Sequence, residues 1–334
     1  MTLPGTAEVV LASGELSVTL LPAKGGDIFR LVDVASGTDV LFKSPWGLRP
    51  PPWAGSTSME RFIEAYPGGW QLLLPNGGDE CTYAGARLPY HGEAAVVPWE
   101  LLDRRPGAAT LGVALRTAPL SVERELAVEG PVLRITERVT NRSPDPYECM
   151  WSHHPAFGAP FLDGGCRLSV GCETVVADDR SPGTLLEAAS RHEWPLATSV
   201  AGLPVDLRVV PPPGLPRSLL AYAEDFVEPY FAISNPDLGL GVGVRWPREV
   251  FPTAWLWQEV HEGAGWPWFR QAYVVAVEPA STSPGQGLVA ALGRGGHGVR
   301  FAPHETVEVV VEAVLFHGGR DVAGIDEGGR VRFR

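Results

Sequence analysis

The sequence predicts an all-β protein, a large antiparallel β-sandwich with few short helices. Apolar and polar residues alternate over short spans, which is the pattern of strands with one buried face. Helix-length amphipathic patterns are scarce, and the 39 glycines and 32 prolines are spread along the chain, as many short connections require. Because the strand pattern continues without a break, we expect one domain over residues 1–334.

Clear alternation first occurs over Glu15–Leu21, in the letters E-L-S-V-T-L-L. It returns over Ala109–Thr117 and Val122–Val128, and again near the C-terminus over Thr306–Phe316. Leu185–Ser190 is long enough for one or two helical turns at most. These segments predict strands joined by short loops.

The clearest hairpin is predicted where two alternating segments meet at Gly130 and Pro131. Glycine and proline interrupt a strand ladder and turn the chain. In the second segment, Ile135 and Val139 are expected on one face of the sheet and Arg134 on the other.

Bulk composition narrows the class of protein. The formal net charge is −12 and the pI is near 5.2, which disfavours a nucleic-acid partner. No apolar stretch approaches the roughly 18 residues of a membrane span, and the first residues, M-T-L-P-G-T-A-E, lack a basic, apolar leader. We expect a cytoplasmic protein without a membrane partner and with reduced thiols at Cys81, Cys149, Cys166 and Cys172.

Three sequence-distant residues have the chemistry of acid–base catalysis. His91 ends L-P-Y-H, His154 lies in S-H-H-P-A-F-G, and Glu278 follows the apolar run V-V-A-V. Imidazole exchanges a proton near neutral pH, and a carboxylate at the end of a buried strand can be tuned into a base. Each of these residues also has an ordinary structural interpretation, so the hypothesis requires that the fold brings them together.

The order of these phrases resembles the aldose 1-epimerase, or galactose mutarotase-like, superfamily. The matching pieces are His91-Gly92, the strand ending V-T-N-R-S, H-P-A-F-G at residues 154–158, W-L-W-Q-E, and V-E-P at residues 277–279. The resemblance implies a β-sandwich whose concave face holds a sugar. It also implies that His154 is the general acid for the ring oxygen, Glu278 the general base for the anomeric hydroxyl, and His91 a substrate-orienting residue. Ring opening by this route needs no cofactor or metal.

His153 and His154 are adjacent in a predicted strand, so their side chains are expected on opposite faces. The resemblance selects His154 because Pro155 and Phe157 follow it. Trp257 shares a strand face with Trp255 and is a candidate platform for a sugar ring, although each could instead fill the core.

The chain departs from the family before His91. Many members carry an Arg-bearing G-R-x-x-N-R phrase there, and this chain reads M-E-R-F-I-E-A-Y-P-G-G-W-Q-L-L-L-P-N-G-G. Further candidates for sugar contacts are therefore Arg61, Trp70, Gln71 and Asn76, with Asp225 as a candidate acidic contact from the second half of the chain.

The sequence leaves alternatives open. One is a non-catalytic carbohydrate-binding protein on the same fold. Another is a sugar-phosphate 1-epimerase, which would need arginines such as Arg61, Arg87 or Arg245 to converge on the pocket. A third is an Fe(II) enzyme with two histidines and one carboxylate as ligands, although no close H-x-D/E pair of the expected kind supports it.

Overall fold

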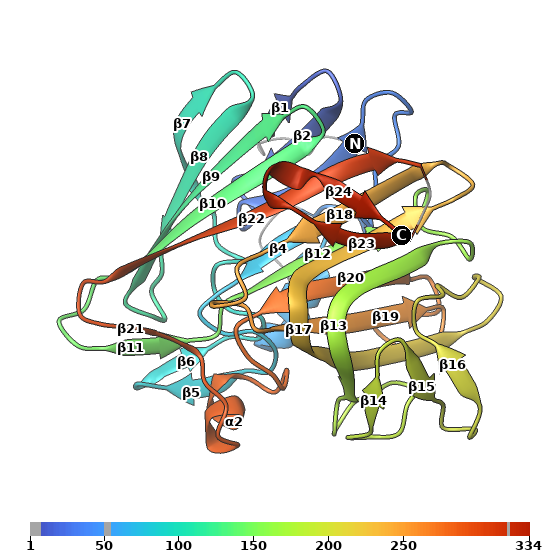
Figure 1. The fold of residues 1–334 in the computed structure, drawn as a ribbon. Coiled ribbons are helices and arrows are strands. Elements are labelled where there is room, and N and C mark those ends of the chain that lie inside the picture. Colours follow the sequence, from blue (N-terminus) through green and yellow to red (C-terminus); the bar gives the residue numbers. More distant parts are fainter. Residues whose placement is uncertain (1–7, 50–54, 319–320) are drawn as a thin grey trace.

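Antiparallel strands dominate the computed structural model, which describes residues 8–49, 55–318 and 321–334 (Figure 1). Most strands join one large sheet, in the order β1-β2-β3-β4-β12-β20-β19-β17-β18-β22-β10-β9-β8-β7, with β13 beside β17 and β14 beside β13. Only short helices interrupt them in the described part of the chain. The predicted all-β class is confirmed.

The strands of the large sheet have the following bounds: β1 Val9–Ala12, β2 Leu16–Leu21, β3 Asp27–Asp33, β4 Trp70–Leu73, β7 Glu100–Arg105, β8 Ala108–Ala114, β9 Leu120–Glu129, β10 Val132–Asn141, β12 Ser152–Gly158, β13 Arg167–Ala177, β14 Arg191–Glu193, β17 Arg217–Asn235, β18 Leu240–Arg245, β19 Thr253–Val260, β20 Tyr273–Ala280 and β22 Thr306–His317.

Shorter elements surround this sheet. Four two-stranded pairs are β5 Cys81–Tyr83 with β6 Ala86–Leu88, β11 Tyr147–Cys149 with β21 Val299–Phe301, β15 Leu196–Thr198 with β16 Pro204–Asp206, and β23 Val322–Ile325 with β24 Val331–Phe333. The helices are α1 Ser58–Ala65, α2 Leu288–Gly293 and the 3-10 turn η1 Glu327–Gly329.

The strands expected from alternation are β2, β8, β9 and β22, with small differences at their ends. The predicted hairpin is confirmed: Glu129 pairs with Val132, and Gly130 turns the chain with φ +53°. Ile135 is buried and Arg134 exposed, as alternation requires.

Leu185–Ser190 does not form a helix. The backbone N–H groups of Thr184 and Leu185 donate to the carbonyl of Ser218, and the N–H of Ala189 donates to the carbonyl of Asp178. The N–H of Ser190 donates locally, to the carbonyl of Glu187, but this single turn is not continued because the neighbouring N–H groups bond to distant segments.

The large sheet curves through β17. The Arg217–Ala223 part of this strand pairs with β19, and the Tyr230–Asn235 part pairs with β18. Between these parts Asp225 has φ +55°, which bends the strand. Figure 1 shows β17 passing from the β18 and β22 side of the molecule toward β19 and β20. The sheet thereby encloses a core between its two halves. Strands β1 and β2, from one end of the strand order, contact β8 and β9 from the other end.

An ion pair lies inside this core. Arg124 of β9 and Glu137 of β10 are fully buried, and Arg124 Nε lies 2.8 Å from Glu137 Oε1. Glu137 also accepts a hydrogen bond from Trp151 Nε1 at 3.1 Å and faces His153 Nε2 at 3.4 Å. The two halves of the sandwich therefore meet through charged and polar groups beside β12.

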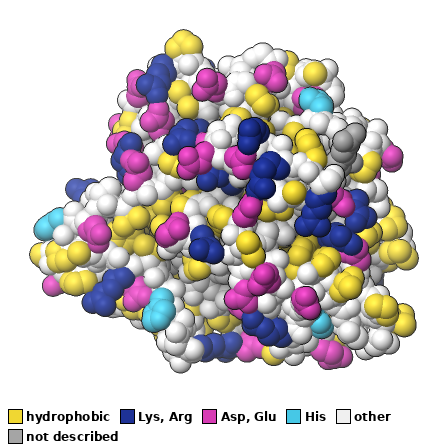
Figure 2. Space-filling view, viewed as in Figure 1, with side chains coloured by type: hydrophobic (Ala, Val, Ile, Leu, Met, Phe, Trp, Pro, Cys, Tyr) yellow, Lys and Arg dark blue, Asp and Glu magenta, His cyan; other side chains and the backbone are white. Residues whose placement is uncertain are grey.

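Charges of both signs are interleaved on the face of the molecule shown in Figure 2.

Among the described residues, no helix has the length and hydropathy of a transmembrane span.

Candidate active site

His154 projects from a buried strand into a cavity. All residues of β12 are buried, and the strand lies between β4 and β20 in the sheet. The expected alternation holds: His153 is fully buried, and its Nδ1 atom accepts a hydrogen bond from Trp70 Nε1 at 3.1 Å. His154 is 6% exposed and lines the cavity. Strand geometry thus separates one core histidine from one cavity histidine.

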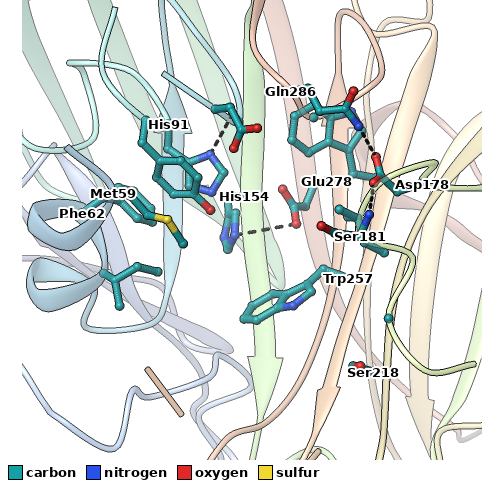
Figure 3. Close-up of a pocket in the computed structure, with 18 of the residues that line it drawn as sticks. Met59, Phe62, His91, His154, Asp178, Ser181, Ser218, Trp257, Glu278 and Gln286 are labelled. Carbon is teal, nitrogen blue, oxygen red and sulfur yellow. Dashed lines mark hydrogen bonds and ion pairs between the residues drawn. The ribbon is translucent and has the colours of Figure 1, made fainter. Parts of the chain in front are cut away.

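Glu278 reaches the same cavity because of strand register. β12 and β20 are antiparallel, with Ser152 opposite Ala280 and Ala156 opposite Ala276, so Glu278 falls opposite His154. Cross-strand partners place their side chains on the same face of a sheet. Accordingly, Glu278 Oε1 lies 3.7 Å from His154 Nε2 (Figure 3).

His91 enters the cavity from a tight loop. Its backbone is left-handed, with φ +57°, and Gly92 follows with φ +78°. The His91 N–H donates to the carbonyl of Gly78, and the Gly78 N–H donates to Nδ1 of His91, both at 2.9 Å. Because Nδ1 accepts a hydrogen bond and so carries no proton, a neutral His91 carries its ring proton on Nε2. Its ring centre lies 5.7 Å from that of His154.

The cavity has a volume of about 420 Å³. In Figure 3, His154, Glu278 and Trp257 lie between an apolar wall that includes Met59 and Phe62 and a polar wall that includes Asp178, Ser181 and Gln286. Six aromatic residues contribute to the lining, and such rings can receive the C–H face of a sugar. The aromatic lining residues are Phe62, Tyr66, Tyr90, Trp255, Trp257 and Trp268.

Burial disfavours charge on all three candidate residues. It raises the pKa of Glu278 well above the ordinary value of 4.5. Burial lowers the pKa of His154 to about 4, the nearby carbonyl of its own backbone opposes this change, and the charge of Lys24 adds to it. Burial, followed by the neighbouring His154, holds the pKa of His91 well below 6.5. At neutral pH the two imidazoles are therefore uncharged, and His91 is a hydrogen-bond donor.

Two candidates from the sequence, Trp70 and Gln71, lie on β4 and do not line the cavity. Trp70 is fully buried and bonds to His153. Gln71 is fully buried, and its Nε2 atom donates to Asp27 Oδ2 at 2.9 Å and to the carbonyl of Gly68 at 2.8 Å. Both expectations of a sugar contact are corrected. Trp70 fills the core on the His153 face of the sheet, and Gln71, on the His154 face, is held by Asp27 and Gly68 outside the cavity lining.

Asn76 is a further correction. It is fully buried and does not line the cavity. Its Nδ2 atom donates to the carbonyls of Asp79 and Pro89, and its Oδ1 atom accepts from the N–H of Leu288. Asn76 therefore supports the loop that carries His91 instead of facing a ligand.

Arg61 and Asp225 also lie outside the cavity. Arg61 faces a neighbouring groove on α1, and its guanidinium donates to the carbonyls of Gly55 and Ser56. Asp225 is exposed at the bend of β17 and pairs with Arg191 at 2.9 Å. The positive φ of Asp225 turns its side chain to solvent, so the expected acidic contact is not supplied by this residue.

Sequence reasoning missed Asp178, an acidic residue that does line the cavity. Asp178 follows the last residue of β13 and is 2% exposed. Its Oδ1 atom accepts from the N–H groups of Arg180 and Ser181, at 2.9 and 2.6 Å. Its Oδ2 atom accepts from the Tyr222 hydroxyl and from Gln286 Nε2. The available signal was an acidic residue after the buried strand ending V-V-A.

No cluster of three or more His, Cys, Asp or Glu side chains in the described ranges is arranged to hold a metal ion. His91, His154 and Glu278 therefore lack the ligand geometry that the iron hypothesis required.

Comparisons with known proteins identify the fold. No family model matches the chain, and no curated protein matches it either. Among solved structures, it is similar to a Synechocystis protein at 18% identity and a TM-score of 0.68, covering 95% of this chain and 98% of that one. A galactose mutarotase related enzyme from Lactobacillus acidophilus matches at 13% identity and a TM-score of 0.66, over 94% and 99% of the two chains. An aldose epimerase homologue from C. elegans matches at 12% identity and a TM-score of 0.62. The match covers 94% of this chain and 100% of that one.

The chain therefore has the galactose mutarotase-like fold, as the resemblance in the sequence implied. At these low identities it is a divergent example of that fold, and the comparisons speak to the fold alone.

Proposed function

We propose that this protein interconverts the α and β anomers of an aldose or aldose derivative, as an aldose 1-epimerase. The observation that carries the proposal is the juxtaposition of His154 Nε2 and Glu278 Oε1, 3.7 Å apart, on the floor of an aromatic cavity. A pyranose has two oxygens on its anomeric carbon, the ring oxygen O5 and the hydroxyl oxygen O1. Ring opening requires a proton to reach O5 while another leaves O1.

The two residues can share these tasks. His154 donates a proton to O5 as the C1–O5 bond breaks, and Glu278 accepts the proton of the O1 hydroxyl. The product is an open-chain aldehyde. Rotation about C1–C2 presents the other aldehyde face to the C5 hydroxyl, and ring closure returns both protons with the roles reversed. Atoms and charge balance over the cycle, and no oxidant or reductant takes part.

The active charge state follows from this scheme. Before reaction, the pair must hold one proton beyond the single ring N–H of neutral His154, either on the imidazole as imidazolium or on the Glu278 carboxyl group. Burial disfavours the charged form of each group, so an uncharged pair with the proton on Glu278 is the resting form. A transfer of this proton to His154, as the sugar oxygens replace water, produces the reactive form. The Nε2–H group of His91 then orients a sugar oxygen, in keeping with its neutral state.

Anomer exchange by NMR on a panel of aldoses tests the proposal. The wild-type protein is expected to accelerate exchange of at least one sugar, and Glu278→Gln is expected to lose that acceleration. Glu312→Gln is a matched control, because Glu312 is also a buried strand carboxylate but pairs with Arg134 and Arg245 outside the cavity. Full activity of Glu278→Gln, or no exchange with any sugar, would remove the proposal.

Sugar binding without catalysis is the second candidate function. It is favoured by one observation: Arg61, the basic candidate from the segment before His91, does not enter the cavity. Calorimetry that detects sugar binding to a wild-type protein without anomer exchange would establish this function instead.

A sugar phosphate receives less support as substrate. Arg61 and Arg87 face the neighbouring groove, and Arg245 pairs with Glu312. Arg180 does line the cavity at its exposed edge, but Asp79 and Asp178 line it as well and would repel a phosphate. Inclusion of hexose 6-phosphates in the NMR panel separates the two classes of substrate.

A further inference from the structure

Tyr66 is held at the cavity by the end of helix α1. Thr57 and Glu60 form a capping box at the start of this helix. Tyr66 is the C-cap, with φ −76° and ψ 105°, and its N–H donates to the carbonyl of Ile63 at 3.2 Å. Pro67 follows, and a proline disfavours helical geometry at the preceding residue. The local sequence therefore ends helix α1 at Ala65 and fixes the backbone position from which the Tyr66 side chain projects.

The aromatic ring of Tyr66 is packed on several sides. It stacks on Phe62 with ring centres 5.8 Å apart and an interplanar angle of 20°. Phe42 lies at 6.3 Å and Trp268 at 6.4 Å. An edge-on contact at 5.5 Å joins the Tyr66 ring to that of His154. These contacts fix the position of the phenol before any ligand binds, which is the condition for a preorganised site.

The hydroxyl of Tyr66 has no hydrogen-bond partner among the described residues, although the side chain is only 2% exposed and lines the cavity. Buried hydroxyls normally have partners, because leaving one unpaired costs stability. His154 Nδ1 and Glu278 Oε2 also lack a hydrogen-bond partner in the described structure, and His154 and Glu278 line the same cavity. Three residues that line one cavity therefore each carry an unsatisfied polar atom, which indicates a polar ligand.

Electrostatics fix the role of this hydroxyl. Burial raises the pKa of Tyr66 well above 10, and the carboxylates of Glu278 and Asp27 raise it further. The phenol therefore keeps its proton and can donate it in a hydrogen bond. It adds no charge to the cavity, in contrast to an arginine.

We propose that Tyr66 is a further substrate-binding residue, whose hydroxyl donates a hydrogen bond to an oxygen of the bound sugar beside His154 and Glu278. The inference rests on the proposed function and deepens it. Tyr66 supplies from α1 the polar contact for which the sequence suggested Arg61, and it does so with a neutral donor.

Tyr66→Phe tests the proposal, with Tyr147→Phe as its matched control. The Tyr147 hydroxyl is likewise buried and without a partner in the described structure, but Tyr147 packs against Tyr83 away from the cavity. NMR measures anomer exchange, calorimetry measures sugar binding, and denaturant titration measures unfolding. We expect Tyr66→Phe to lower kcat/KM about 10- to 100-fold, the loss of one buried hydrogen bond, without lowering the denaturation midpoint. Tyr147→Phe is expected to retain the wild-type kcat/KM.

The outcomes separate this inference from the proposed function. Wild-type exchange that Tyr66→Phe leaves unchanged would overturn the role of Tyr66 and leave the proposed function intact. Sugar binding without exchange, weakened by Tyr66→Phe but not by Tyr147→Phe, would support the role of Tyr66 and refute epimerase activity. A Tyr66→Phe protein that loses stability and activity together would show that the hydroxyl stabilises the fold, and this result would overturn the inference. No binding of any sugar by the wild-type protein would overturn both.

Discussion

His153 and His154 are consecutive residues of β12 whose imidazoles serve opposite faces of the sheet. His153 accepts a hydrogen bond from Trp70 in the core, and His154 lines the cavity opposite Glu278. This dipeptide therefore contributes one histidine to the core and one to the cavity.

Substitution of each histidine by glutamine is expected to give different defects. His154→Gln removes the proposed proton donor, so anomer exchange should fall about 100- to 10,000-fold with little change in unfolding. His153→Gln disturbs the buried contacts to Trp70 and Glu137, so the free energy of unfolding should fall by about 1–3 kcal/mol while exchange persists. NMR exchange and urea titration measure the two effects, and the opposite assignment of defects would contradict the site.

Stability should depend on pH through the buried site. Burial lowers the pKa of His154 to about 4 in the folded protein, while the unfolded chain keeps the ordinary value of 6.5. Between these values only the unfolded state binds the proton, so His154 makes the free energy of unfolding rise with pH. Glu278 acts in the opposite sense, because its raised pKa contributes stability below pH 4.5 that is lost as the pH rises through the folded value.

Urea titrations from about pH 4 to 7.5 isolate these contributions. His154→Gln should reduce the slope of unfolding free energy against pH by up to about 1.4 kcal/mol per pH unit in the window from 4 to 6.5. Glu278→Gln should make the rise with pH steeper above 4.5. Parallel pH profiles for wild type and both variants would show that neither group changes its pKa on folding.

The buried pair of Arg124 and Glu137 is expected to be strongly coupled. Burial alone raises the pKa of Glu137, but the charges of His153 and Arg124 and the hydrogen bonds of His153 and Trp151 outweigh it, so the pKa is lowered. Arg124→Met removes the arginine partner of this buried carboxylate, leaves it with Trp151 and His153, and should cost about 3–5 kcal/mol. The double variant Arg124→Met/Glu137→Met should cost less than the sum of the single changes. A double-mutant cycle by urea titration measures the coupling, and simple additivity would argue against it.

Trp257 should contribute to sugar binding through its ring. It is half-buried in the cavity, with its ring centre 5.7 Å from that of His154 and 5.9 Å from that of Trp268. Trp257→Ala should weaken the binding of a substrate sugar about 10-fold, whereas Trp257→Phe keeps an aromatic surface and most of the affinity. Calorimetry measures both, and equal affinity in the two variants would exclude stacking on this residue.

The alternation of apolar and polar residues and the order of the short motifs predicted much of the fold. They predicted the all-β class, the hairpin at Gly130 and the opposite orientations of His153 and His154. The stretch from Met59 to Asn76 was the weakest part, because it lacks a repeating pattern. Trp70 and Gln71 were proposed there as sugar contacts, but the structure brings Tyr66 of the same stretch to the cavity.

By itself, the sequence determined the class of fold and the local direction of side chains, since both follow from patterns of two to ten neighbouring residues. Only the tertiary structure decided which distant residues meet. The register of β12 against β20 joins His154 to Glu278, and the fold of the sheet brings Asp178 to the same cavity from the end of β13. The sequence shows Asp178 as an acidic residue after a buried strand, but only the tertiary structure shows which cavity it lines. Such contacts depend on long-range strand pairing, whose energetics are spread over the whole sheet and are not contained in any short segment.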